Sequence, residues 1–232
     1  MAADLPRREL LHAFVALAVT LLIMAALLFL AAGTLDWLHG WLFMLVFCGL
    51  ILVSIGALWQ LNPEIFVARA RPTGEGTKGW DRVLMTILLV AYAAIFPVAG
   101  LDDGRFHWTS VSAWLVALGY VLVITGFAGV AWAEAVNRHF EPSVRIQSDR
   151  NHTVVNTGPY AYVRHPGYVA GSLLAVGAAW ALGSWWALLP AAIVVVAMVV
   201  RTNLEDATLQ RELPGYAEFV AKTRFKWMPG VW

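Results

Sequence analysis

Cysteine is almost absent from this chain: Cys48 is the single cysteine among 232 residues. An intramolecular disulfide is therefore excluded, and so is a metal site built from several thiolates. Charge is also scarce, because charged residues make up 13% of the chain, against about 25% in a typical soluble domain. The formal net charge of +1 gives no reason to expect a nucleic-acid partner.

Several catalytic signatures are missing as well. The sequence contains no glycine-rich phosphate loop, no HExxH motif and no Ser-His-Asp order. The histidines His39, His107 and His139 are widely separated and lack the spacing of metal ligands. We therefore expect no metal site.

Apolar residues are what the chain has in excess: 60% of it is hydrophobic and the mean hydropathy is +0.68. Since about 20 apolar residues suffice for a helix to cross a bilayer, the long apolar runs predict membrane spans. These runs cover residues 14–32, 37–59, 83–101, 111–133 and 168–200. The first run is longer than the core of a typical signal peptide, so we interpret it as an uncleaved helix.

The last apolar run is too long for a single crossing. Its 33 residues would extend roughly 50 Å as one helix, whereas the hydrocarbon core is about 30 Å thick. Gly183-Ser184 interrupts the run, so we expect a helical hairpin over residues 166–200. The predicted fold class is an all-α integral membrane protein with five to six transmembrane helices, a C-terminal helical hairpin and a cytosol-facing pocket.

Basic residues lie almost entirely on one side of these spans. Of the 16 lysines and arginines, only Arg105 falls on the other side, and the positive-inside rule makes the basic side cytoplasmic. We therefore expect a multi-pass protein with both termini in the cytoplasm. Residues 1–133 would form an N-terminal four-helix transmembrane region and residues 134–232 a C-terminal region. The polar segments 134–164 and 201–232 both flank the hairpin, so a site made from both would open to the cytosol.

The segment from Thr157 to Tyr168, with the sequence TGPYAYVRHPGY, places turn-forming, aromatic and basic residues directly before the hairpin. Proline is favoured at the first position of a helix, so Pro166 is expected to open one. The amides of Gly167 and Tyr168 would then lack partners within the helix, and such a helix start attracts carboxylates and phosphates. Tyr160 adds an aromatic surface beside it.

Two further segments extend this candidate site. The strip from His152 to Val155 contains β-branched residues and is expected to be extended, with free backbone groups. After the hairpin, Arg201 and Glu205 are four residues apart and share one helical face. A guanidinium at that position suits a carboxylate or a phosphate. The strip, the tyrosine and the helix start together predict a nucleotide-sized pocket.

Each of these features also has a simpler interpretation. Arg164 and His165 could anchor the chain at the membrane interface, and the nearby tyrosines could belong to an aromatic belt. Arg201 and Glu205 could form an ordinary salt bridge along one helix.

Taken together, the last hundred or so residues resemble the isoprenylcysteine carboxyl methyltransferase family and its bacterial relatives, which are also similar to phospholipid N-methyltransferases. The matching residues are, in chain order, Val154-Val155, Thr157-Gly158-Pro159-Tyr160, Val163-Arg164-His165-Pro166, Tyr168, Gly171, Arg201, Glu205-Asp206, Leu209 and Gly215-Tyr216. The chain departs from the family pattern at Asp206, where a second glutamate is usual. It departs again at Leu213-Pro214-Gly215, which replaces an aromatic-glycine step before Tyr216.

The resemblance implies a polytopic enzyme of the bacterial inner membrane that uses S-adenosyl-L-methionine as methyl donor. Its implied cofactor-binding residues are Gln147, His152, Thr153, Val154, Val155, Tyr160, His165, Pro166, Gly167, Tyr168 and Glu205. Arg201, as the implied catalytic residue, would face the methyl acceptor. The acceptor would be lipophilic or small and would enter from the membrane lipid. A carboxylate is favoured, because the sequence offers no convincing general base for an amine or a thiol.

Two other functions are compatible with the same residues. One is an intramembrane NADPH-dependent reductase of the sterol-reductase type, although this chain is short for that family. The other is a non-catalytic membrane scaffold or accessory protein. The scaffold interpretation predicts that Tyr160, His165 and Glu205 tolerate substitution without loss of ligand binding.

Overall fold

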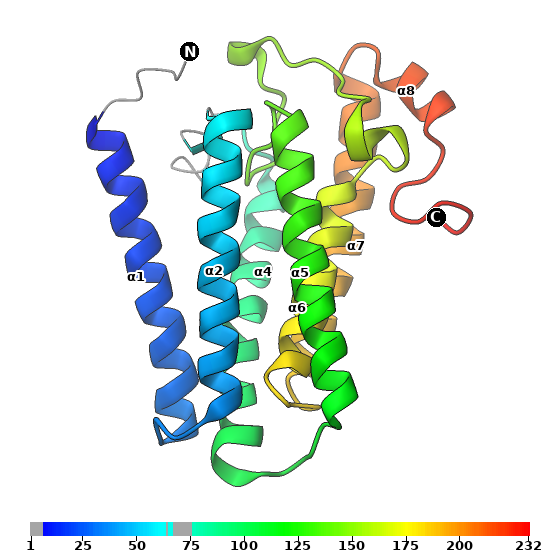
Figure 1. Cartoon of the computed structure of the whole chain (residues 1–232). Helices are drawn as coiled ribbons and strands as arrows, with labels where there is room; N and C mark the ends of the chain where they lie inside the picture. The colour runs from blue at the N-terminus through cyan, green and yellow to red at the C-terminus, as the bar shows by residue number, and fades with distance from the viewer. Residues whose placement is uncertain (1–6, 64, 67–75) are drawn as a thin grey trace.

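The computed structural model describes residues 7–63, 65–66 and 76–232, which form a bundle of helices (Figure 1). The helices are α1 (Arg7–Ala32), α2 (Leu38–Leu61), α4 (Gly79–Ala99), α5 (Ala113–Val136), α6 (Pro166–Ala181), α7 (Leu188–Glu212) and α8 (Tyr216–Lys222). A π-helical segment, η1 (Gly100–Phe106), continues α4, and two short 3-10 turns are η2 (Ser148–Arg150) and η3 (Gly158–Ala161). The described residues contain no strand, so the predicted all-α class is confirmed.

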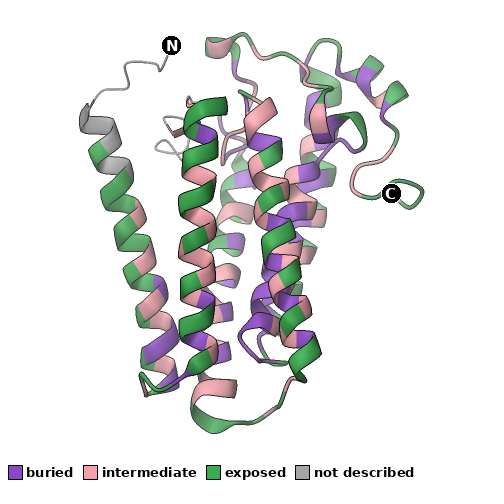
Figure 2. Ribbon diagram, viewed as in Figure 1, coloured by how far each residue is buried: buried purple, intermediate pink, exposed green. Residues whose placement is uncertain are grey.

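Five of the described helices are long and apolar enough to cross a membrane: α1, α2, α4 with η1, α5 and α7. The remaining apolar helix, α6, is shorter, with 16 residues. The outer faces of α1 and α2 are apolar, as shown by Leu22, Leu45 and Val53, which are 70%, 71% and 71% exposed. Figure 2 shows these two helices largely exposed along their length. Such faces suit contact with lipid, and the predicted five to six spans are confirmed as five long helices and one short arm.

The predicted hairpin is formed by α6 and α7. Gly183 in the turn has a φ of +75°, a left-handed conformation that glycine adopts without strain. The buried carboxylate of Asp102 in η1 accepts hydrogen bonds from the Ser184 hydroxyl (2.6 Å) and the Trp186 amide (3.3 Å). The expected break at Gly183-Ser184 is therefore present, and Asp102 fixes it.

Helices α5 and α6 pack closely at glycine positions. A Cβ built on Gly177 would lie 2.8 Å from the carbonyl oxygen of Gly119, so the two backbones approach as only residues without side chains permit. This contact joins the beginning of α5 to the end of α6, so the two antiparallel helices also bring the start of α6 beside the end of α5. The loop that joins them then lies at one end of the bundle.

The two polar segments that flank the hairpin meet at that end (Figure 1). The amides of Arg164 and His165 donate to the carbonyls of Phe225 and Lys226, both at 3.0 Å. Buried residues are concentrated on α6 and α7, as the purple ribbon in Figure 2 shows. The α5–α6 loop and the C-terminal segment thus rest on the most buried part of the bundle.

Candidate active site

A cavity of about 310 Å³ lies at the polar end of the bundle, between the α5–α6 loop, α6 and α7. The twelve residues predicted for the site all line it: Gln147, His152, Thr153, Val154, Val155, Tyr160, His165, Pro166, Gly167, Tyr168, Arg201 and Glu205. These residues come from segments up to 58 positions apart in the chain, between Gln147 and Glu205. The fold therefore gathers the whole predicted set around one space.

The start of α6 forms one wall of the cavity. Pro166 is its first residue, as predicted, and His165 is the residue that precedes the helix. The amide of Tyr168 donates to the carbonyl of His165 at 3.2 Å, so the expectation of a free amide is wrong at this position. A Cβ on Gly167 would lie 2.8 Å from the ring of Phe140, so a larger residue at this position would require that ring to move. Of the two predicted donors, the Gly167 amide is the one without a hydrogen-bond partner in the part of the chain that the structure describes.

Arg164 and His165 are buried and bind Asp206 of α7, so the interfacial-anchor interpretation is wrong. The Arg164 guanidinium donates to both Asp206 oxygens, at 2.8 and 3.0 Å, and its third nitrogen donates to the carbonyls of Thr223 and Arg224. His165 Nε2 lies 3.2 Å from the same carboxylate. The pair thus holds α7 and the C-terminal segment against the start of α6.

A second wall contains two histidines from the α5–α6 loop. The side-chain amide of Gln147 donates to the carbonyl of His139 at 2.7 Å, which orients its oxygen toward His139 Nδ1, 3.2 Å away. An amide oxygen only accepts, so Nδ1 carries the hydrogen and Nε2 can accept from the Thr153 amide at 3.4 Å. The ring of His152 lies 4.6 Å from that of His139. Both histidines are therefore arranged as neutral groups.

The environment of these histidines favours the neutral state. Burial lowers the pKa of His139 below its ordinary value. Burial, together with the neighbouring His139 and the positive charges of Arg145 and Arg150, lowers the pKa of His152 to about 4. This wall of the cavity is polar but uncharged at neutral pH.

Tyr160 in η3 is buried beside this wall. Its hydroxyl accepts a hydrogen bond of 3.0 Å from the side chain of Asn137, which in turn accepts from the His139 amide at 2.9 Å. Burial raises the pKa of Tyr160 well above its usual value, so the hydroxyl stays protonated. The aromatic-belt interpretation is therefore wrong for Tyr160, whereas Tyr162 is 66% exposed.

Arg201 lies on the opposite wall and does not form the salt bridge with Glu205 that its helical spacing suggested. Instead it pairs with Asp81 of α4, with Nε–Oδ1 and Nη2–Oδ2 distances of 2.7 and 3.1 Å. Its guanidinium also lies 5.3 Å from the centre of the Tyr168 ring. Glu205 accepts a hydrogen bond from the Tyr168 hydroxyl. The two residues thus share Tyr168 as a neighbour without binding each other.

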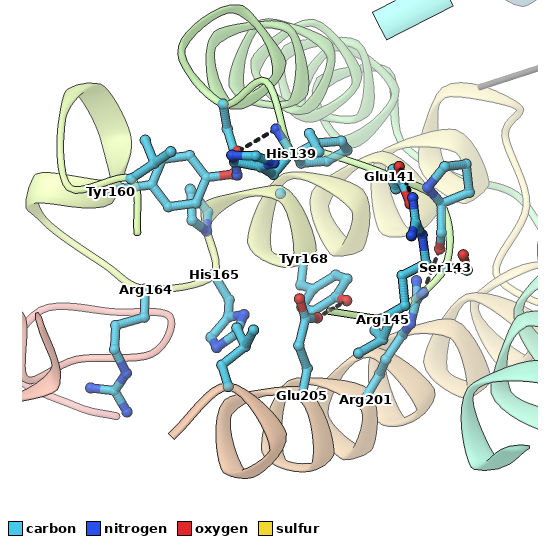
Figure 3. Close-up of a pocket in the computed structure, with 18 of the residues that line it drawn as sticks. His139, Glu141, Ser143, Arg145, Tyr160, Arg164, His165, Tyr168, Arg201 and Glu205 are labelled. Carbon is cyan, nitrogen blue, oxygen red and sulfur yellow. Dashed lines mark hydrogen bonds and ion pairs between the residues drawn. The ribbon is translucent and has the colours of Figure 1, made fainter. Parts of the chain in front are cut away.

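A charged group in the α5–α6 loop completes this wall. Arg145 donates two hydrogen bonds to Glu141, at 2.8 and 3.0 Å, and a third of 2.7 Å to Asp149. In Figure 3, Glu141, Ser143 and Arg145 lie on the side opposite Tyr160, with Tyr168 and Glu205 between them. The cavity therefore has a neutral polar side and a charged side.

Sequence reasoning missed four residues that shape the cavity: Asn137, His139, Glu141 and Arg145. All four lie in the irregular loop after α5. Glu141 and Arg145 are four residues apart, a spacing typical of one helical face, but the backbone there is not helical. No periodic pattern in the sequence therefore identifies which residues face the cavity. Proximity to the predicted strip at His152 was the one available indication.

Fold and cavity together define a multi-pass membrane protein with a polar site at one end of a bundle whose outer helices suit lipid. Residues 112–214 match the family model described as phospholipid methyltransferase. The resemblance seen in the motifs is confirmed over this region, where the chain is similar to that family.

One curated relative is the cobalt-zinc-cadmium resistance protein CzcN of Cupriavidus metallidurans. It is 32% identical to this chain over 133 residues, which cover 55% of this chain and 56% of the relative. The chain thus matches about half the length of this curated relative.

Proposed function

We propose that this chain is an integral membrane methyltransferase that uses S-adenosyl-L-methionine and methylates a lipophilic or small acceptor, with a carboxylate favoured. The observation that carries the proposal is the convergence of the twelve predicted residues on one cavity. Its volume of about 310 Å³ is within the range of small-molecule sites, about 300–1,000 Å³. The methyltransferase family match over residues 112–214 supports the reaction class.

The residues present fit the chemistry of this cofactor. When bound, it would supply a methyl group made electrophilic by a sulfonium centre. A neutral polar wall with His139, Gln147 and Tyr160 suits the uncharged base and ribose. The carboxylate of Glu205, whose partner is the Tyr168 hydroxyl, suits a positively charged part. The Gly167 amide at the helix start suits the amino-acid carboxylate.

Arg201 suits an anionic acceptor. Its Nε and Nη2 are occupied by Asp81 and the carbonyl of Pro142, whereas Nη1 has no hydrogen-bond partner among the described residues. Two N–H groups are therefore left to orient a carboxylate oxygen. An ionised carboxylate has no proton to lose, so this acceptor needs no general base. Positioning and removal of water are then the main contributions of the protein.

A second cavity suits the hydrocarbon part of the acceptor. It measures about 280 Å³, lies between α1, α2 and α5, and is lined mainly by apolar side chains such as Phe14, Leu58 and Phe127. Val130 of α5 lines both cavities. A lipophilic acceptor could enter from the bilayer through the second cavity and present its polar end to the first.

We infer the membrane orientation from the distribution of basic residues. Among the described elements, Arg105 in η1 lies at the end of the bundle opposite the cavity, whereas Arg138, Arg145 and Arg164 lie at the cavity end. The positive-inside rule then makes the cavity end cytoplasmic. Both termini would face the cytoplasm, of a bacterium in this proposal, where the soluble cofactor is available.

The first test is binding of S-adenosylhomocysteine to the detergent-purified protein by calorimetry. We expect micromolar affinity for wild type and a loss of at least about tenfold for Glu205→Gln, because a charge-assisted contact is removed. Glu218→Gln on the exposed side of α8 is the matched control and should bind like wild type.

The alternatives give different results in the same experiment. A folded wild type that does not bind S-adenosylhomocysteine but binds NADPH would support the reductase. Binding of neither ligand would support the non-catalytic scaffold. Either result would overturn the proposed function.

A further inference from the structure

Asp81 lies in the first turn of α4, outside the region that matches the methyltransferase family. Its side chain is completely buried, with 0% exposure. An aspartate is rarely buried in this way unless a cation and several donors surround it. Here the cation is Arg201, 120 residues further along the chain.

Both oxygens of Asp81 are used. Oδ1 accepts from Arg201 Nε at 2.7 Å, and Oδ2 accepts from Arg201 Nη2 at 3.1 Å and from the Val144 amide at 2.7 Å. The carboxylate therefore joins α4, α7 and the part of the α5–α6 loop that lines the cavity. Arg201 Nη2 also donates to the carbonyl of Pro142 in the same loop.

This arrangement fixes which part of the guanidinium is available to a ligand. A guanidinium carries five N–H donors in one plane. Asp81 and Pro142 occupy the donors of Nε and Nη2, so rotation of the side chain away from the cavity would cost the bidentate pair. The Tyr168 ring covers one face of the guanidinium at 5.3 Å. Nη1 is left with a fixed direction.

We propose that Asp81 is a positioning residue for methyl transfer: it holds Arg201 so that Nη1 meets an anionic group of the acceptor. The inference rests on the proposed function. Asp81 contacts Arg201 and the loop but does not line the cavity itself. It acts on the acceptor through Arg201.

The electrostatic role separates Asp81 from a simple packing residue. Asp81→Asn keeps the shape and one acceptor oxygen but removes the negative charge and one arm of the bidentate pair. The guanidinium then loses its fixed orientation. Asp81→Glu keeps the charge on a longer side chain and should recover part of the loss. Gln147 and Tyr160 on the neutral wall form hydrogen bonds with His139 and Asn137. The affinity for the cofactor should therefore stay as in wild type.

The test measures two steps separately in detergent-purified protein. Calorimetry gives the affinity for S-adenosylhomocysteine, and also for N-acetyl-S-farnesylcysteine, a lipophilic carboxylate, added to the S-adenosylhomocysteine-loaded protein. Methyl transfer to the same carboxylate gives kcat and KM. The variants are Asp81→Asn, Asp81→Glu, Arg201→Lys and the double variant Asp81→Asn/Arg201→Lys. The matched control is Glu212→Gln, which removes the surface ion pair with Lys78 that also joins α7 to α4.

We expect Asp81→Asn to lower affinity or kcat/KM for the carboxylate by at least about thirtyfold, because one partner of a buried bidentate ion pair is removed. The affinity for S-adenosylhomocysteine should stay within about threefold, and Asp81→Glu should recover about tenfold of the loss. In the Arg201→Lys background, Asp81→Asn should lower the affinity or kcat/KM for the carboxylate by less than about a further threefold, since both changes break the same interaction. Glu212→Gln should behave like wild type.

Three results would overturn the positioning role. In the first, Asp81→Asn has the same affinities and kcat/KM as the control variant. In the second, the fold-losses of Asp81→Asn and Arg201→Lys multiply in the double variant. In the third, Asp81→Asn lowers the affinity for S-adenosylhomocysteine as much as the affinity for the carboxylate, which indicates a general structural role. A wild type that binds S-adenosylhomocysteine but not the carboxylate would refute acceptor binding by Arg201 and, with it, this role of Asp81. A wild type that binds neither would refute the proposed function itself.

Discussion

The carboxylate of Asp206 accepts two hydrogen bonds from the guanidinium of Arg164, at 2.8 and 3.0 Å, and both side chains are almost completely buried. The same carboxylate also accepts from the Tyr216 hydroxyl at 3.0 Å. One residue of α7 therefore holds the segment before α6 and the beginning of α8. The segments that this ion pair joins contribute Arg164, His165 and Tyr216 to the cavity wall.

Removing Arg164 should destabilise the protein strongly. Arg164→Ala leaves the Asp206 charge buried without its main partner, which typically costs about 3–5 kcal/mol of unfolding free energy. The change is measured by thermal unfolding in detergent. Arg211→Ala, on the exposed side of α7, is the control and should alter the free energy by less than about 0.5 kcal/mol. Equal melting temperatures for the two variants would contradict the structural role of the pair.

The neutral histidines predict a specific loss of stability in acid. The pKa of His152 is about 4 in the folded protein, against about 6.5 in an unfolded chain. Between these values the unfolded chain binds more protons, so the free energy of unfolding falls as pH falls from about 6.5 toward 4. Melting temperatures measured across this interval should decrease. His152→Asn should flatten the decrease, and an unchanged slope in that variant would count against His152 as a cause.

Close packing of α5 against α6 makes Gly119 sensitive to a single methyl group. A Cβ on Gly119 would overlap the backbone nitrogen of Ala181, which cannot move without shifting α6. Gly119→Ala should therefore destabilise the protein by about 1–3 kcal/mol, as overpacked sites do. Gly49→Ala in α2 is the matched control, because nothing lies within 4 Å of its Cβ position. If both variants unfold at the same temperature, the helices are not in such close contact.

The shared position of Val130 predicts a variant that separates binding of cofactor from methylation of long acceptors. Val130→Trp would fill the space between the two cavities. We expect S-adenosylhomocysteine affinity within about threefold of wild type and a loss of at least about tenfold in kcat/KM for a farnesylated acceptor. Val121→Trp, on an exposed face of the same helix, should have no such effect. Full activity of Val130→Trp would mean that the acceptor does not pass this residue.

The parts of the fold that could be predicted from the sequence are those encoded locally. Runs of about twenty apolar residues specify membrane helices with little ambiguity, and Gly183-Ser184 marks the hairpin turn because glycine supplies the left-handed backbone there. The start of α6 could also be predicted, since proline is disfavoured in a helix interior but fits the first position of a helix, where Pro166 lies.

Contacts between segments that are distant in the sequence could not be predicted from it in the same way. Asp81 looks like an ordinary acid in the first turn of a helix, and nothing near it in sequence indicates that its partner is Arg201. Glu205 is nearer to Arg201 in sequence, yet Asp81 forms the pair because its buried carboxylate accepts from two of the guanidinium nitrogens and from the Val144 amide. The cost of burying a charge is lowest where most donors converge, and that convergence exists only in three dimensions.

The bond between Asp81 and Arg201 also bears on how the protein is made. The ribosome synthesises Asp81 well before residue 201. Asp81 therefore has no Arg201 partner while α5 and α6 insert into the membrane. Only when α7 arrives are both charges neutralised and the loop over the cavity tied down. Under the proposed function, the chain would therefore gain methyltransferase activity in a late, single step of biogenesis, after α7 is in place.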